Sequence, residues 1–184
     1  WRLSDTPNIY TRLELTNWPV WLVDNEEVLA ERVKVFPEGQ FLVRDSNGFP
    51  IACLSTNRVN WKDAPNPKGL PRSWDYCAGV EPGTSFEEAY DPDGNALVLL
   101  VINIHPDYKG AQIPGHFMKA AKDFAESQSI DHVISPFRPS GYGEYKLSHR
   151  DPGFLEYCLT KREDGLPQDT WLRNLERNGM QIIG

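Results

Sequence analysis

The residues best suited to chemistry gather in HPDYKGAQIPGHF, residues 105–117. This stretch follows an apolar run and precedes apolar residues at helical spacing, which predicts a loop from a buried strand into a helix. The unpaired backbone N–H groups of such a loop, with the positive end of the helix, favour an anion, usually a pyrophosphate. Gly110, Ala111 and Gly115 let a phosphate approach the backbone, and Lys109 adds charge. We therefore expect a phosphate-holding loop here.

Two positions in this loop depart from the usual small residues, because they hold Gln112 and Pro114. Proline has no N–H, so one phosphate contact is lost, worth about 1.5–3 kcal/mol if it is charge-assisted. The first turn of a helix nevertheless tolerates proline. The loop lacks the GxxxxGK[ST] and GxGxxG patterns, which argues against nucleotide-triphosphate and dinucleotide sites. We therefore expect this phosphate-holding loop, called the cradle below, to bind a phosphate more weakly but not to lose the binding altogether.

Other side chains with suitable chemistry flank the loop or follow a later strand. His105 and His116 could exchange protons near neutral pH, although packing on the strand explains His105 equally well. Three polar residues follow the predicted strand 132–137, where a carboxylate or phosphate could bind. A structural salt bridge would explain them nearly as well. They are Arg138, Ser140 and Lys146.

The elements that must position these residues follow from periodicity and turn signals. Asp24 or Asn25 caps an amphipathic helix that ends near Phe36, and Asn47-Gly48 marks a hairpin turn. Residues 60–95 predict a long ordered loop with a short helix. The order predicts an α/β fold with a mixed sheet. The remaining predictions are strands at 40–45, 49–57, 95–104, 132–137 and 180–183, and helices at 115–126 and 169–178.

Length, charge and cysteine content exclude several classes of protein. A chain of 184 residues fits one domain, 1–184, and no apolar run is long enough to span a membrane. A net charge of −7 argues against nucleic acid as a partner. Three widely spaced cysteines suit neither a disulfide framework nor a metal site, and no other cluster has ligand spacing. We expect a cytoplasmic protein without a metal.

The stretch Val101–Pro114 resembles the acyl-CoA pyrophosphate loop of the GNAT superfamily of N-acetyltransferases, V-x-x-x-H-P-x-Y-[R/Q]-G-x-G-[I/L]-G/A. The order of elements also agrees over residues 20–184. Three further stretches, APNPKGLPRSWD, SPFRPSGYGEYKL and EYCLTKREDGLPQDTWLRNLERNGMQII, are similar to a GNAT-like subgroup of unassigned substrate. The resemblance implies a mixed, mostly antiparallel sheet flanked by helices, with acetyl-CoA or another acyl-CoA as cofactor.

The resemblance also implies roles for individual residues. The acyl-CoA would lie between the strands 95–104 and 132–137, with its thioester carbonyl on a backbone N–H near Ile102 or Ile104. Its pyrophosphate would lie over one segment of the loop and helix. That segment comprises Lys109, Gly110, Ala111, Gln112, Ile113, Gly115 and His116.

Two departures from the family pattern concern the end of the chain. Many GNAT enzymes have a tyrosine that protonates the departing thiolate where this chain has Leu175, and the subgroup has a histidine there. Another donor is then needed, and we expect Tyr142, Tyr145 or Tyr157, with His105 as a further candidate. The superfamily's last strand has no counterpart after residues 180–183. A homodimer or another partner would complete that edge.

The sequence thus predicts an enzyme that moves an acetyl or other acyl group from acyl-CoA to a small-molecule amine, since an acidic surface attracts cationic acceptors. Two other functions stay open. One is a non-catalytic module that binds CoA or a protein, which Gln112, Pro114 and Leu175 favour. The other is decarboxylation of malonyl-CoA or acyl transfer to a carrier-protein thiol, which requires no base for an amine.

Overall fold

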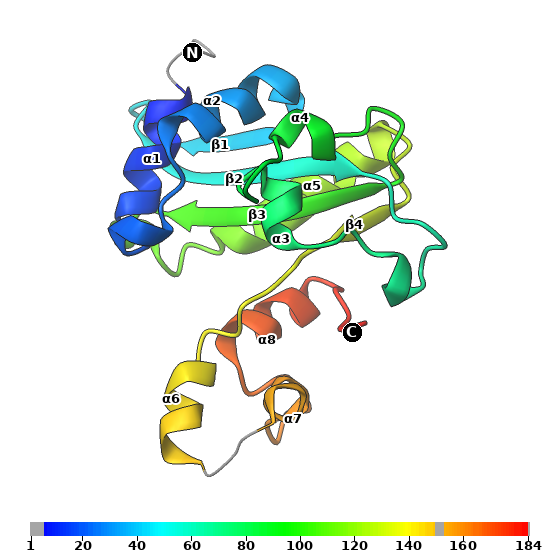
Figure 1. The fold of residues 1–184 in the computed structure, drawn as a ribbon. Helices are drawn as coiled ribbons and strands as arrows, with labels where there is room; N and C mark the ends of the chain where they lie inside the picture. Colours follow the sequence, from blue (N-terminus) through cyan, green and yellow to red (C-terminus); the bar gives the residue numbers. More distant parts are fainter. Residues whose placement is uncertain (1–5, 150–152, 184) are drawn as a thin grey trace. The chain divides into compact units, whose positions relative to one another are not determined.

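The computed structural model describes residues 6–149 and 153–183 (Figure 1). The chain divides into two compact units, Trp1–Pro136 (unit 1) and Phe137–Gly184 (unit 2), which are described separately. No described helix is both long and apolar enough to cross a membrane. That all 184 residues act as one acyl-CoA-binding domain stays a prediction.

Unit 1 contains a four-stranded sheet in the order β1-β2-β3-β4. β1 pairs with β2 and β2 with β3 in antiparallel register, whereas β3 and β4 are parallel. The predicted mixed, mostly antiparallel sheet is therefore confirmed. The strands are β1 (Gln40–Arg44), β2 (Pro50–Val59), β3 (Ala96–Ile104) and β4 (His132–Ile134).

Helices cover both faces of this sheet (Figure 1). Four helices lie on one face, and α5 (Ile113–Ser127) lies on the other. Asn25 caps α2 through its side chain, which accepts a hydrogen bond from the Val28 N–H, as the sequence predicts. The four helices are α1 (Thr6–Leu15), α2 (Glu26–Val35), α3 (Trp74–Ala78) and α4 (Phe86–Ala89).

The core between α1, α2 and the sheet contains Tyr10, Leu13, Leu29 and Cys53. Helix α1 was not predicted from the sequence, although the buried Tyr10 and Leu13 are three residues apart, as residues on one face of a helix are. It also predicts one short helix in residues 60–95, where α3 and α4 both form with serine caps. Four short 3₁₀ helices connect the elements: Val20–Leu22, Pro37–Gly39, Pro67–Gly69 and Pro106–Tyr108.

Unit 2 is helical and contains α6 (Tyr142–Ser148), α7 (Phe154–Leu159) and α8 (Thr170–Arg177). The predicted strand at 180–183 is wrong, because α8 ends at Arg177, Gly179 then has a φ of +77°, and residues 180–183 have no regular structure. The only strand-like pairing in the described part of unit 2 is the bridge between Lys161 and Pro167, so residues 180–183 have no strand to join. β4 ends at Ile134, earlier than predicted, before Pro136, which has no N–H for a ladder.

Candidate functional site

The loop between β3 and α5 is a chain of tight turns. Tyr108 N–H donates to the His105 carbonyl at 2.9 Å, and Lys109 N–H donates to the Pro106 carbonyl at 3.2 Å. Ala111 N–H then donates to the Tyr108 carbonyl at 3.2 Å. The chain's own hydrogen bonds therefore fix the backbone of this loop.

Three backbone N–H groups of this loop make no hydrogen bond to any described residue. The N–H groups of Gly110, Gln112 and Ile113 have no acceptor among the described residues. Gly110 has a φ of +97° and Gln112 one of +55°, and such turns group successive N–H donors into an anion-binding concavity. The N–H groups of Gly115 and His116 already donate to the Gln112 carbonyl. The available donors therefore gather at residues 110–113, just before the helix.

The two unusual residues of the loop have different effects. Pro114 lies in the first turn of α5, as predicted, where its missing N–H breaks no helical bond. Gln112 is the N-cap of α5, but its side chain caps no N–H group. Its left-handed conformation ordinarily favours glycine. The expected weakening of the cradle stays a prediction.

The β1–β2 hairpin supports the loop from the side. Tyr108 Oη donates to Asp45 Oδ2 at 3.2 Å, and the ring of Phe49 meets the ring of His105 edge to face. Hydrogen bonds, first that from the Phe49 N–H, lower the pKa of Asp45 below its ordinary value. His105 Nδ1 accepts weakly from the Asp107 N–H at 3.4 Å. The structure thus gives His105 a place in the loop's scaffold, and its catalytic role stays a prediction.

β3 and β4 form the second part of the site, because they pair over only three residues. Ala96, Leu97 and Val98 of β3 pair with β4, and no described strand pairs with residues 99–104 on that edge. His105 N–H donates to the carbonyl of Ile51 in β2 at 2.8 Å. Backbone groups alternate between the two edges of a strand. Those of Ile102 and Ile104 therefore point to the edge that β4 leaves uncovered.

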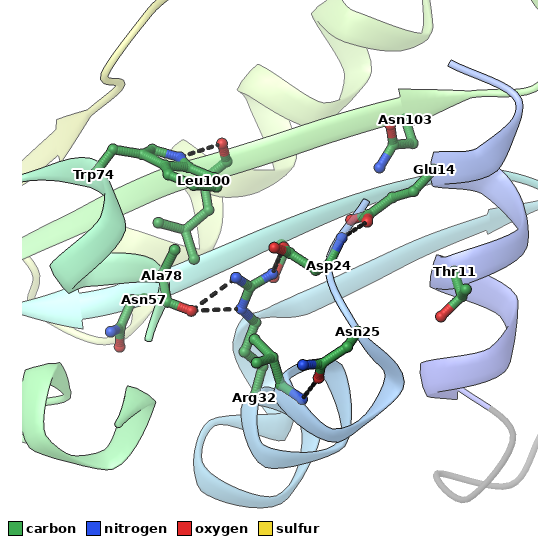
Figure 2. Close-up of polar contacts among 12 residues, drawn as sticks. Thr11, Glu14, Asp24, Asn25, Arg32, Asn57, Trp74, Ala78, Leu100 and Asn103 are labelled. Atoms are coloured by element: carbon green, nitrogen blue, oxygen red, sulfur yellow. Dashed lines mark hydrogen bonds and ion pairs between the residues drawn. The ribbon is translucent and has the colours of Figure 1, made fainter. Parts of the chain in front are cut away.

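A β-bulge occurs where β4 stops pairing. Thr56 of β2 pairs with Leu99 and Ser55 with Val101, which leaves Leu100 as the extra residue. The Leu100 carbonyl accepts a hydrogen bond from Trp74 Nε1 at 2.9 Å (Figure 2). Bulges next to active sites redirect backbone groups. Sequence reasoning missed this one, because nothing local to NALVLLVINI signals an extra residue.

A buried polar layer lies between α1, α2, α3 and the sheet (Figure 2). Arg32 is fully buried, and its Nη1 contacts Asp24 Oδ2 at 2.7 Å. Its Nε and Nη2 both donate to the Ala78 carbonyl, at 3.1 and 2.7 Å. A buried charge with this many partners ties α2 to α3.

Glu14 and Asn103 adjoin this layer and are not fully satisfied. Glu14 is 2% exposed and Asn103 is 0% exposed. Glu14 Oε2 accepts from the Asp24 N–H at 2.9 Å, and Asn103 Oδ1 accepts from Trp18 Nε1 at 2.9 Å. Glu14 Oε1 and Asn103 Nδ2 have no hydrogen-bond partner in the described structure. Burial, then the nearby Asp24, raises the pKa of Glu14 to about 7.

Sequence reasoning missed Glu14, Arg32 and Asn103 as a group. A signal was present for Glu14, which lies four residues after the buried Tyr10 and therefore on the inward face of α1. Asn103 interrupts the apolar run of β3, and a polar residue in a fully covered strand indicates a specific partner. The partners themselves are distant in sequence and follow only from the fold.

In unit 2, Asp169 organises several of the predicted residues. Its Oδ2 accepts from Ser140 Oγ at 3.1 Å, from the Gly141 N–H at 2.8 Å and from Tyr157 Oη at 3.0 Å. Its Oδ1 accepts from the Trp171 and Leu172 N–H groups and caps α8. Burial and the bond to Asp169 raise the pKa of Tyr157 to about 12. Ser140 and Tyr157 therefore have structural partners, and their site roles stay predictions.

The other predicted residues of unit 2 lie nearer the surface. Tyr145 stacks on His149 with ring centroids 3.8 Å apart, and Arg138 and Lys146 are exposed. Leu175 is buried in α8 and has no proton to donate. The cradle residues belong to unit 1 and these residues to unit 2. That they form one site with the cradle stays a prediction.

Comparisons with known proteins identify the fold. No family model matches the chain, and no curated protein matches its sequence. Among solved structures, the loading GNATL domain of CurA from Lyngbya majuscula is 20% identical, with a TM-score of 0.79 over 100% of this chain and 83% of that one. The GphF GNAT-like decarboxylase, in complex with isobutyryl-CoA, is 21% identical, with a TM-score of 0.75 over 100% of this chain and 85% of that one. The chain has the GNAT fold, as predicted.

Proposed function

We propose that this chain binds an acyl-CoA through residues 105–116 and the neighbouring edge of β3, and that it acts on the acyl thioester. The observation that carries the proposal is the group of open N–H donors at Gly110, Gln112 and Ile113, which precedes the positive end of α5. Lys109 is exposed beside them and adds a positive charge for a pyrophosphate.

The uncovered edge of β3 supports the same proposal. A pantetheine chain has amide groups that can pair with a strand edge, and β3 offers the backbone of Ile102 and Ile104 there. A thioester carbonyl bound to one of these N–H groups would be polarised, and charge that develops on its oxygen would be stabilised. Cradle and edge are joined through His105, so one extended ligand can contact both.

For the reaction, we favour decarboxylation of a malonyl-type acyl-CoA, or delivery of its acyl group to a thiol. Support comes from the two structures that match the whole length of the chain, one a loading domain and the other a decarboxylase. Decarboxylation needs no base for an incoming amine. It requires a stabilised enolate and a proton donor.

Acyl transfer to a small-molecule amine is the second candidate, and the charge distribution favours it. Unit 2 has equal numbers of acidic and basic residues, so the net charge of −7 belongs to unit 1. A negative field draws cationic acceptors toward the unit that contains the cradle.

Product analysis separates the two reactions. The protein would be incubated with malonyl-CoA alone, with acetyl-CoA and N-acetylcysteamine, and with acetyl-CoA and 1,4-diaminobutane, and the products followed by liquid chromatography and mass spectrometry. Acetyl-CoA from malonyl-CoA, or acetyl-N-acetylcysteamine, supports the favoured reactions. Acetylated diamine alone would replace them with the second candidate, and no product from any mixture would contradict catalysis on these substrates.

A further inference from the structure

The buried pair of Glu14 and Asn103 adjoins the edge of β3 where the proposed acyl site lies. Asn103 stands between Ile102 and Ile104, and neighbouring residues of a strand are about 3.3 Å apart. Its side chain faces α1, since it contacts Trp18 and neighbours Glu14 (Figure 2). The carboxyl of Glu14 is therefore one side chain away from the proposed position of the thioester.

Glu14 Oε1 and Asn103 Nδ2, the two atoms of this pair without a hydrogen-bond partner, can both act as donors. Native proteins give nearly every buried polar atom a partner, so two orphaned atoms in adjacent side chains need an explanation. Asn103 Nδ2 is a donor that lies near the Glu14 carboxyl and stabilises its charged form, and Glu14 Oε1 itself becomes a donor when the carboxyl is protonated. In the protonated state both atoms are donors without an acceptor, beside the backbone N–H groups of the β3 edge, and they suit an oxygen or carbon that gains negative charge during a reaction.

The surroundings of Glu14 favour its protonated form at neutral pH. Burial, then the charge of Asp24, raises its pKa to about 7, and three weaker effects lower it: the hydrogen bond from the Asp24 N–H, then the charge of Arg32, then the side-chain amide of Asn103. The other titratable groups that face it are Tyr10 on α1 and Cys53 on β2, and burial raises the pKa of both, so both are neutral. A neutral carboxylic acid can donate a proton near neutral pH.

Among the described residues, Trp18, which is partly exposed, lies between Asn103 and solvent. Trp18, which holds Asn103 Oδ1, is 37% exposed and belongs to the segment between α1 and α2. Its neighbours Val20 and Trp21 are also exposed. The proton that Glu14 loses can thus be replaced from water at this side of unit 1.

We infer that Glu14 is the proton donor of the acyl site and that Asn103 positions the enolate. The inference rests on the proposed acyl-CoA function. In the step, the bond between the carboxylate carbon and Cα of a malonyl thioester breaks and CO₂ leaves. The electron pair forms the thioester enolate, whose Cα takes the proton from Glu14. The Glu14 carboxylate then regains a proton from water, so acetyl thioester and CO₂ are the products.

The first test needs no turnover. Carbon-13 NMR of the protein labelled at glutamate Cδ would follow Glu14, assigned with Glu14→Gln, during titration with acetyl-CoA. The site predicts a resonance that titrates near pH 7 in the free protein and shifts when acetyl-CoA binds. A Glu14 resonance that is unchanged at saturating acetyl-CoA would overturn the inference. Failure of the wild-type protein to bind any CoA species would instead count against the proposed function.

The second test measures decarboxylation of malonyl-CoA by Glu14→Gln and by a control, Glu31→Gln. Glu31 accepts from the Phe86 and Glu87 N–H groups at α4, so the control removes the same charge elsewhere in unit 1. Loss of a general acid predicts a rate at least about 100-fold lower for Glu14→Gln, with CoA affinity within about twofold. The wild-type kcat/KM should fall as pH rises through about 7.

Glu14→Asp should recover part of the rate lost in Glu14→Gln, because it keeps the acid. A Glu14→Gln rate within about threefold of wild type, with the pH dependence intact, would assign Glu14 a structural role only. A wild-type protein that binds acetyl-CoA but leaves malonyl-CoA intact would overturn the protonation step.

Discussion

Among single residues, Glu14 gives the clearest dependence on pH. Its carboxyl has a pKa of about 7 in the folded protein and an ordinary, lower value when unfolded. The folded state therefore binds more protons between about pH 4.5 and 7, and stability falls as pH rises through this window.

Glu14→Gln removes this dependence, because glutamine does not titrate. Below about pH 4.5 the wild type and the variant should have similar stability. At pH 8 the variant should be more stable by about 1–3 kcal/mol, as it avoids a buried charge. Urea unfolding across pH 5–8 measures the difference between the two proteins. A difference that does not vary with pH would show that Glu14 is not the buried titrating group.

In unit 2, the buried Asp169 joins the start of α8 to Gly141 and Tyr157 through hydrogen bonds. Asp169→Ala should destabilise unit 2 by about 2–4 kcal/mol, because a helix cap and several charge-assisted bonds are lost together. Hydrogen exchange of the α8 amides measures this loss. Asp164→Ala is the control, since Asp164 is exposed, and it should cost less than about 1 kcal/mol. Equal effects of the two substitutions would contradict the role given to Asp169.

At the scale of elements, α5 begins at a residue that suits its conformation poorly. Gln112 has a φ of +55°, and glycine adopts that conformation without strain. Gln112→Gly should therefore raise stability by about 0.5–1 kcal/mol and leave CoA binding intact, because the open N–H group is kept. Ser129→Gly is the control, since Ser129 has a φ of +54° just after α5. Thermal unfolding and CoA titration measure both. A loss of binding in Gln112→Gly would show that the glutamine side chain itself contacts the ligand.

The elements also show what sequence could predict. Asn47-Gly48 located the hairpin, because Gly48 takes a φ of +81° in the turn, and Asn25 located the start of α2. Residues 180–183 have a strand-like composition but no partner strand among the described residues of unit 2, so composition alone led to a wrong prediction. The loop 105–113 was predictable because its residues are consecutive. Glu14 with Asn103, and Trp74 with Leu100, were not, since each pair comes from distant segments that only the fold joins.

At the scale of the whole molecule, the net negative charge of unit 1 should affect the binding of a cationic acceptor. If unit 1 draws a cationic acceptor by its negative field, the KM for 1,4-diaminobutane should rise several-fold as salt increases from about 0.01 to 0.15 M, because the screening length falls to about 8 Å. The KM for the uncharged N-acetylcysteamine should stay nearly constant over the same range. Steady-state kinetics at several salt concentrations measure both. A diamine KM independent of salt would remove the support that charge gives to amine transfer.

Binding of acyl-CoA at residues 105–116 can be measured by isothermal titration with acetyl-CoA, malonyl-CoA and free CoA, using the wild-type protein, Gly110→Asp and Gly83→Asp. Both glycines have positive φ and open space at Cβ, so the variants match in strain and charge, but only Gly110 lies in the cradle. We expect saturable micromolar binding by the wild type and by Gly83→Asp, and an affinity at least about tenfold lower for Gly110→Asp, whose carboxylate would repel the pyrophosphate. Equal affinities of all three proteins, or no heat with any CoA species, would contradict binding at this site.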